Sequence, residues 1–245
     1  MKQQGLLLLF CLTITNFVFG QTEIHKEKFR QLEPDLWLGI WDKESSSQSI
    51  KIDTLSYDDI PKSIDFRGTV VEALKWSDVN GENILILTVT GNFNWKDYDN
   101  DSTDYMIQDK SELYAYLFQK NNLNKSYKRQ WRVYDYTECF GVDWFTGFTP
   151  KATTITDLDN DGITEITMSY VSICRGGMDP GAMKIIMYEG RTKYALRGST
   201  MLMCESNNAY GGEFTASENL NDSGYFKNFL IKHWNRNKCE EGKYY

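Results

Sequence analysis

Short apolar segments separated by polar turns run through most of the chain and predict a β-sheet protein. Some segments alternate apolar and polar residues, as half-buried strands do, and others are near-continuous apolar runs typical of buried central strands. Clusters of Gly, Asn, Asp and Ser between them supply the residues that tight turns need. Strands are expected at residues 69–76, 84–90, 112–119, 130–136, 153–156, 163–173, 183–188 and 193–197.

The predicted strands occur in the same order twice. A strand leads into a polar Asp/Asn loop, then an apolar strand and an aromatic hairpin, first over residues 76–136 and again over residues 153–197. Residues 91–111 are polar and acidic, and we expect them to form an insertion in the first copy. Two meander units are too few for a closed propeller, which needs at least about four blades. The sequence therefore predicts a mainly β fold of two packed antiparallel sheets that resemble isolated propeller blades.

Near the C-terminus the apolar period changes from that of a strand to that of a helix. An amphipathic helix that packs on the sheets is expected here, with Asp222 or Ser223 as its cap, and membrane or partner binding is the alternative use of its apolar face. The predicted apolar stripe consists of Tyr225, Phe226, Phe229, Leu230, His233 and Trp234, and the polar stripe of Lys227, Asn228, Lys232 and Asn235.

Residues 157–165 (DLDNDGITE) have the spacing of a calcium-binding loop. Carboxylates occupy the first, third, fifth and ninth positions, the seventh contributes a backbone carbonyl, and a glycine at the sixth permits a sharp turn. Acids at alternate positions repel one another unless a cation compensates them. The ligands expected for one structural calcium ion are Asp157, Asp159, Asp161, Ile163 and Glu165. The alternative is a solvated acidic turn without an ion.

A second acidic run, at residues 97–104, copies the alternation of carboxylates but has Ser102 in place of the glycine. It is either a weaker second calcium site or part of a charged insertion.

The N-terminus has the features of a secretory signal peptide. Lys2 precedes an apolar run at residues 6–12, and residues 18–20 (VFG) are acceptable before a cleavage site, so residues 1–20 are expected to be removed. The run is too short for a comfortable transmembrane span. An uncleaved anchor and a lipoprotein modified at Cys11 are the alternatives. Residues 21–62 then form a polar N-terminal segment and residues 63–245 the β domain.

The charge and the cysteines of the mature chain fit an exported protein. Without Lys2 the formal net charge of the chain is 26 − 34 = −8. This negative charge argues against nucleic acid and anionic membranes as partners. An even number of cysteines predicts two disulfides in an oxidising compartment, with three connectivities open and free buried thiols as the alternative. These cysteines are Cys139, Cys174, Cys204 and Cys239.

Aromatic residues are concentrated between residues 131 and 148. Flat rings beside polar groups can bind the apolar face of a sugar, so Trp131, Trp144 and Phe145 are candidate glycan-binding residues. The simpler interpretation, which we favour from the sequence, is that these rings fill the seam between the two sheets.

Several catalytic chemistries lack the residues that they need. His25 and His233 are the only histidines and fit neither a catalytic triad nor a zinc cluster. No glycine-rich phosphate loop is present, which argues against nucleotide binding. A glycoside hydrolase with paired carboxylates stays open. Its candidate acids are Glu138, Asp143, Asp179 and Glu213.

Two resemblances add to these predictions. The loop at residues 157–165 resembles the calcium loops of FG-GAP and VCBS-type repeats, in which the ninth residue is usually Asp rather than the longer Glu165. Residues 183–190 (MKIIMYEG) and 193–198 (KYALRG), together with the aromatic C-terminal helix, resemble a secreted bacterial family associated with lipopolysaccharide biosynthesis. That resemblance implies a cell-envelope setting and brings no catalytic residues.

These features together predict an exported calcium-binding envelope protein, in the periplasm, on the outer-membrane surface or outside the cell. It is expected to support the biosynthesis or display of surface polysaccharide by binding a glycan or an envelope protein. A glycan-processing hydrolase is the second hypothesis.

Overall fold

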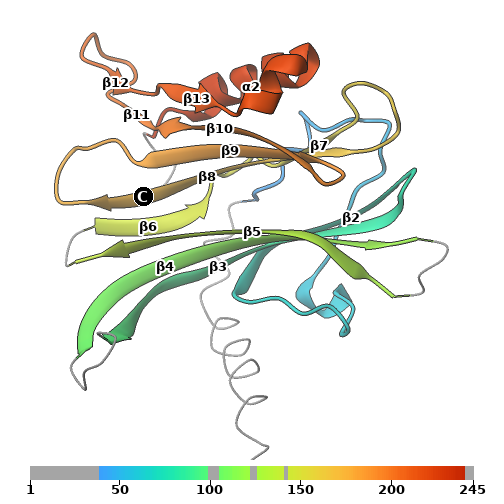
Figure 1. The fold of residues 1–245 in the computed structure, drawn as a ribbon, viewed down its shortest axis with the longest axis horizontal. Coiled ribbons are helices and arrows are strands. Elements are labelled where there is room, and N and C mark those ends of the chain that lie inside the picture. The colour runs from blue at the N-terminus through green and yellow to red at the C-terminus, as the bar shows by residue number, and fades with distance from the viewer. Residues whose placement is uncertain (1–38, 99–104, 122–125, 141–142, 241–245) are drawn as a thin grey trace, which may run out of the picture.

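The computed structural model describes residues 39–98, 105–121, 126–140 and 143–240. The predicted signal peptide, residues 21–38 and His25 lie outside this part of the chain. Most described residues form two antiparallel sheets that pack face to face, with one helix near the C-terminus (Figure 1). The predicted fold class, mainly β with antiparallel sheets and a C-terminal helix, is confirmed.

The first meander forms one sheet and the second meander forms most of the other. The first sheet has the order β1 (Asp53–Thr54), β2 (Thr69–Asp78), β3 (Gly81–Tyr98), β4 (Tyr105–Lys120) and β5 (Lys128–Cys139). The second has the order β13 (Phe214–Ala216), β10 (Thr192–Ser199), β9 (Ala182–Glu189), β8 (Glu165–Arg175) and β6 (Asp143–Phe148), and β7 (Thr154–Thr156) also pairs with β8. A small ribbon joins β11 (Met201–Leu202) to β12 (Tyr210–Gly211).

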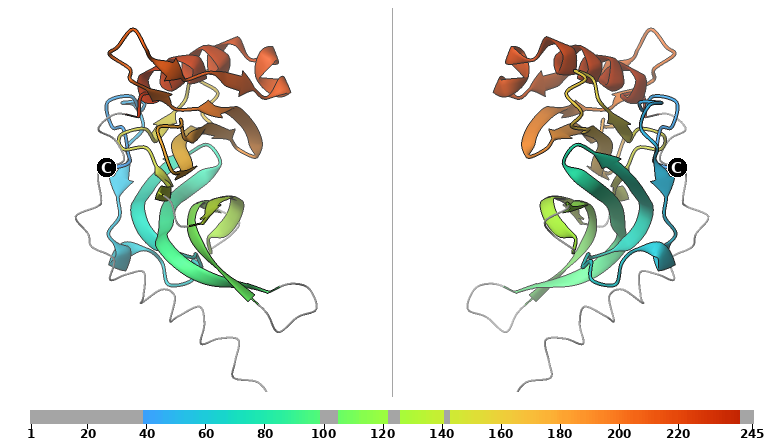
Figure 2. Two further views of the ribbon diagram at one scale, coloured as in Figure 1. Left: turned by 90° about the vertical axis from the view of Figure 1, so that its left-hand side faces the viewer. Right: turned by 90° about the vertical axis from the view of Figure 1, so that its right-hand side faces the viewer.

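Both sheets bury most of each of their two faces. One apolar cluster fills the seam between them, and it includes Leu85 of β3 and Ile186 of β9. The outer face of the first sheet, with Ile84 and Ile86, is covered by the segment around the 3-10 helix η2 (Tyr57–Asp59). Figures 1 and 2 show the resulting layers. Because successive side chains of a strand point to opposite faces, this double burial explains why residues 84–87 are apolar without a break.

The outer face of the second sheet lies under the 3-10 helix η3 (Glu218–Asp222) and the helix α2 (Gly224–Asn237). Phe226, Leu230, His233 and Trp234 are buried on the inner side of α2, as the apolar stripe predicts. Tyr225 does not follow the prediction, since 74% of it is exposed. Ser223 is the N-cap residue, although its side chain makes no capping hydrogen bond.

Two regions differ from the predicted loops. Strands β3 and β4 continue past a register shift between Val89 and Asn92, so much of the predicted insertion at residues 91–111 is a long paired hairpin. Cross-strand hydrogen bonds hold this polar extension, and apolar periodicity therefore gives no signal for it. Residues 143–148, between the strands expected at residues 130–136 and 153–156, form β6 and pair with β8.

The four predicted disulfide cysteines form two bonds. Cys139, at the end of β5, is joined to Cys174 on β8 and so connects the two sheets. Cys204 is joined to Cys239, which follows α2, and so ties the end of the helix to the loop after β11. These pairs choose one of the three connectivities that the sequence left open.

Removing either disulfide is expected to lower the free energy of unfolding by about 2–4 kcal/mol, because the crosslink restricts the unfolded chain. Cys139→Ala/Cys174→Ala and Cys204→Ala/Cys239→Ala are a matched pair, since each bond spans 35 residues. Urea unfolding of both double variants measures the loss. Peptide mapping under non-reducing conditions that found any other pairing would contradict the assignment.

Candidate metal centre

The acidic loop at residues 157–164 connects β7 to β8. The two strands are antiparallel and Thr156 pairs with Glu165, so the ends of the loop lie side by side. Within the loop the backbone turns through positive φ angles at Asn160 (60°) and Gly162 (82°). Gly162 is therefore at a position where a side chain would be strained, as the predicted sharp turn requires.

Three of the predicted ligands come together. Carboxylate oxygens of Asp157, Asp159 and Glu165 all lie within 4.8 Å of one another. Asp161 belongs to a neighbouring group, in which its carboxylate, that of Asp159 and that of Glu189 lie within the same distance of one another. The loop thus forms two adjoining carboxylate groups that share Asp159.

Glu189 is a member that the sequence analysis missed. It lies on β9 directly opposite Glu165 on β8, and like charges in such cross-strand pairs are destabilising. The β8–β9 register would have revealed it, because pairing the two strands around the turn at residues 175–181 places the two acids opposite each other. This second, non-local acid increases the negative charge that the loop sequence alone predicts.

Two carboxylate oxygens in the first group are buried and have no hydrogen-bond partner. Glu165 has no exposed surface. Its Oε2 accepts hydrogen bonds of 2.9 Å from the Thr156 hydroxyl and the Leu158 N–H, whereas Oε1 has no partner. Oδ1 of Asp157 is also buried and without a partner. Unsatisfied buried carboxylate oxygens are costly and call for a compensating group.

The negative charge of ionised Glu165 is also unfavourable in this buried position. Burial raises the pKa of its carboxyl to about 7, and the negative charges of Asp159 and Glu189 act in the same direction. An all-oxygen set of several carboxylates suits a hard cation such as calcium. The residues present therefore fit the predicted ion.

The other two predicted ligands lie close by but have local roles in the loop. Oδ1 of Asp161 accepts a 2.7 Å hydrogen bond from the Ile163 N–H, and Oδ1 of Asp159 accepts one from the Asp161 N–H. These bonds shape the turn. The role of the Ile163 carbonyl as a ligand stays a prediction.

The loop is held from outside by the β2–β3 turn, which occupies the equivalent place in the first meander. The Thr164 hydroxyl donates to Oδ2 of Asp78 at 2.8 Å and accepts from the buried indole N–H of Trp76 at 2.9 Å. The Val79 N–H donates to the Gly162 carbonyl at 3.1 Å. The acidic loop of the second sheet is thus bonded directly to the first sheet.

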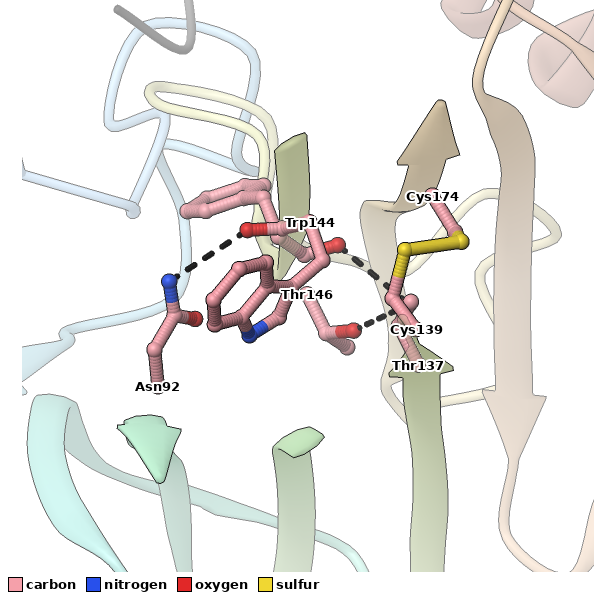
Figure 3. The surroundings of a disulfide bond; sticks show 7 residues. Asn92, Thr137, Cys139, Trp144, Thr146 and Cys174 are labelled. Atoms are coloured by element: carbon pink, nitrogen blue, oxygen red, sulfur yellow. Dashed lines mark hydrogen bonds between the residues drawn. A yellow bond between two sulfur atoms is a disulfide. The ribbon is translucent and has the colours of Figure 1, made fainter. Parts of the chain in front are cut away.

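The candidate glycan-binding residues are separated. Trp131 is 8% exposed in the seam and stacks on Tyr188 with a centroid distance of 4.3 Å, so its ring is not presented to a sugar. Trp144 and Phe145 are both half-buried on β6, and neighbouring side chains of a strand point to opposite faces. Figure 3 shows Trp144 beside the Cys139–Cys174 disulfide, where its carbonyl accepts a hydrogen bond from the Asn92 amide.

A row of tyrosines on the first sheet was not singled out in advance. Tyr134 stacks on Tyr114 at 5.0 Å and on Tyr136 at 5.5 Å between ring centroids. Tyr134 and Tyr136 are 39% and 45% exposed. The Tyr134 hydroxyl donates to the buried carboxylate of Glu112 at 3.2 Å. The alternation of residues 132–136 in the sequence predicts this row, because it places Tyr134 and Tyr136 on one face of β5.

The remaining candidates come from different elements of the fold. Of the four acids considered for a hydrolase, Glu138 alone lines a described cavity, of about 370 Å³, beside Arg175 and Ser172. His233 is buried on α2 and stacks on Phe229. In the second acidic run, residues 99–104 lie outside the described part of the chain.

Comparison with known proteins adds no relative, because no family model, curated protein or solved structure matches this chain. Among the described residues, no helix is long and apolar enough to cross a bilayer.

Thr164→Val is expected to lower the free energy of unfolding by about 1–3 kcal/mol, because it leaves the buried indole N–H of Trp76 without an acceptor. Urea unfolding measures the effect. Thr192→Val is the matched control, since Thr192 is exposed at the start of β10. Equal losses in the two variants would contradict the assigned role of the Thr164 hydroxyl.

Proposed function

We propose that this chain is an exported calcium-binding protein in which the ion fixes the loop at residues 157–165. The observation that carries the proposal is the pair of buried, unpartnered oxygens on Glu165 and Asp157, with Asp159 beside them. Calcium bound there would satisfy both oxygens and neutralise charges that otherwise repel. Because the loop is bonded to Asp78 and Val79 of the first sheet, its fixation would also strengthen the joint between the sheets.

Export is supported by the pattern of the N-terminus and by the two disulfides, which persist in oxidising compartments. The resemblance to a secreted family associated with lipopolysaccharide biosynthesis supports a place in the cell envelope. The proposed role there is to bind a surface glycan or an envelope protein. Calcium sites in extracellular modules have dissociation constants of about 10⁻⁴–10⁻³ M, an affinity that would suit a structural site in an exported protein.

Calcium is expected to raise the melting temperature of the mature protein. At one hundred times the dissociation constant, a ligand that binds only the folded state adds about 2.7 kcal/mol, or roughly 5–10 °C for a domain of this size. Thermal unfolding in EDTA and in calcium chloride measures the shift. Magnesium should give a smaller shift, because it prefers a stricter octahedral geometry and releases its water reluctantly.

Glu165→Gln should abolish the calcium shift while keeping an oxygen for the Thr156 and Leu158 hydrogen bonds. Glu218→Gln removes the same charge at an exposed position before α2 and should keep the shift. A wild-type protein whose melting temperature is the same in calcium and in EDTA would rule out the proposed site.

Glycan binding is the second candidate function. The row of tyrosines is a better candidate for the binding surface than Trp131 and Trp144. Tyr134 and Tyr136 present partly exposed rings next to the charged groups of Glu112, Lys110 and Glu138. An aromatic surface bordered by hydrogen-bonding groups is the usual arrangement for binding a sugar ring.

Replacing both rings, in Tyr134→Ala/Tyr136→Ala, is expected to weaken binding to a glycan array by at least about tenfold, which corresponds to 1.4 kcal/mol. Tyr225→Ala is the matched control, because this tyrosine is exposed on α2. Trp144→Ala tests one of the three glycan-binding candidates from the sequence. A loss of signal with Trp144→Ala and none with the double variant would move the binding surface to β6.

A further inference from the structure

A cationic cavity lies at the seam between the two sheets, beside the edge strand β5. It has a volume of about 370 Å³ and is lined by side chains from four strands. The charged and hydroxyl-bearing side chains that face it are those of Asp135, Tyr170, Lys184, Lys193 and Arg197. Arg132 and Tyr134 also border it, but they have the strand positions of the outer face of β5, opposite to Val133 in the seam.

The strand register explains how these residues meet. One row of cross-strand neighbours on β8, β9 and β10 consists of Tyr170, Lys184 and Arg197. This row lies on the face of the second sheet that packs against the first sheet. Lys193 lies four residues before Arg197 on the same face of β10. β5 is the last strand of the first sheet. The first sheet therefore does not cover the part of β10 that carries Lys193 and Arg197. Lys193 and Arg197 are accordingly exposed.

The cavity is unusual in a chain whose net charge is −7. Three basic side chains, those of Lys184, Lys193 and Arg197, face one carboxylate, that of Asp135, which is engaged by the Lys184 ammonium. Within the described residues, no ion pair is formed by the other two basic side chains, Lys193 and Arg197. Loss of surrounding water lowers the pKa of Lys193, and the nearby cations Arg197 and Lys184 lower it further.

We propose that this cavity binds an oxyanion, a carboxylate or phosphate group carried by a small molecule or by one unit of a larger one. Arg197 supplies a planar guanidinium group that suits either anion, and Lys193 supplies a point charge. The volume is at the lower end of the range for ligand sites, so the anion-bearing unit should be about the size of a monosaccharide. A cavity lined by charges of one sign also attracts its ligand from a distance.

This site is distinct from the acidic loop and requires no calcium. Glu165 and Glu189 have the strand positions of the face covered by α2, whereas Lys184 and Arg197 have those of the opposite face. Tyr134 borders the cavity, but its ring belongs to the tyrosine row on the outer face of the first sheet.

Three sugars that differ in one group test the inference by isothermal titration calorimetry of the mature protein. Glucuronate carries a carboxylate, glucose 6-phosphate carries a phosphate, and glucose carries neither. Binding of either anionic sugar without binding of glucose is the expected result, and the stronger of the two identifies the anion. Absence of binding by both anionic sugars, or equal binding of glucose, would overturn the proposal.

The variant Lys193→Gln/Arg197→Gln should reduce the affinity for the anionic sugar by at least about tenfold. Lys62→Gln/Lys232→Gln removes the same two charges from exposed positions elsewhere and should change the affinity less than about twofold. All four positions are at the surface, so near-UV circular dichroism should show both variants folded. Equal losses in the two variants would show that overall charge, and not the cavity, attracts the anion.

Discussion

The need to cover both faces of both sheets determines how this protein is built. Leu85 and Leu87 point into the seam while Ile84 and Ile86 point outward, and all four are fully buried. A sheet of this kind is stable only if something apolar lies on each side of it. The segment around η2 therefore has to cover the first sheet and α2 the second, and neither of these covering elements is an optional addition to the fold.

The same constraint separates the two charged sites. The first sheet ends at β5 and does not overlap the whole inner face of the second sheet. Lys193 and Arg197 lie on the part of β10 that is left uncovered, whereas a buried position there would require apolar residues. Glu165 and Glu189 have the strand positions of the other face of the second sheet. Strand alternation thus keeps opposite charges from neutralising each other. Each site retains an excess charge that a ligand of the opposite sign can compensate.

The sequence predicts features with a local signal and misses those that depend on register. Residues 84–90 and 183–188 are apolar enough to identify central strands, and the acids at residues 157–165 identify their own loop. The polar extensions of β3 and β4 have no such signal, because paired backbones and not buried side chains hold them. The choice of Cys174 as the partner of Cys139 depends on how two sheets pack. Glu189 reaches the acidic loop only through the β8–β9 register, and the cationic cavity combines β5 with β8, β9 and β10 of the other sheet.

The contact between the acidic loop and the β2–β3 turn suggests why the two meanders differ. In the first meander the turn at residues 78–81 retains Asp78, and this carboxylate accepts a hydrogen bond from the Thr164 hydroxyl. In the second meander the loop has the full set of acids. If both turns carried full acidic sets, their charges would meet at the place where Val79 now contacts Gly162, and repulsion would open the joint. One turn therefore serves as the support, and the other can concentrate charge around an ion.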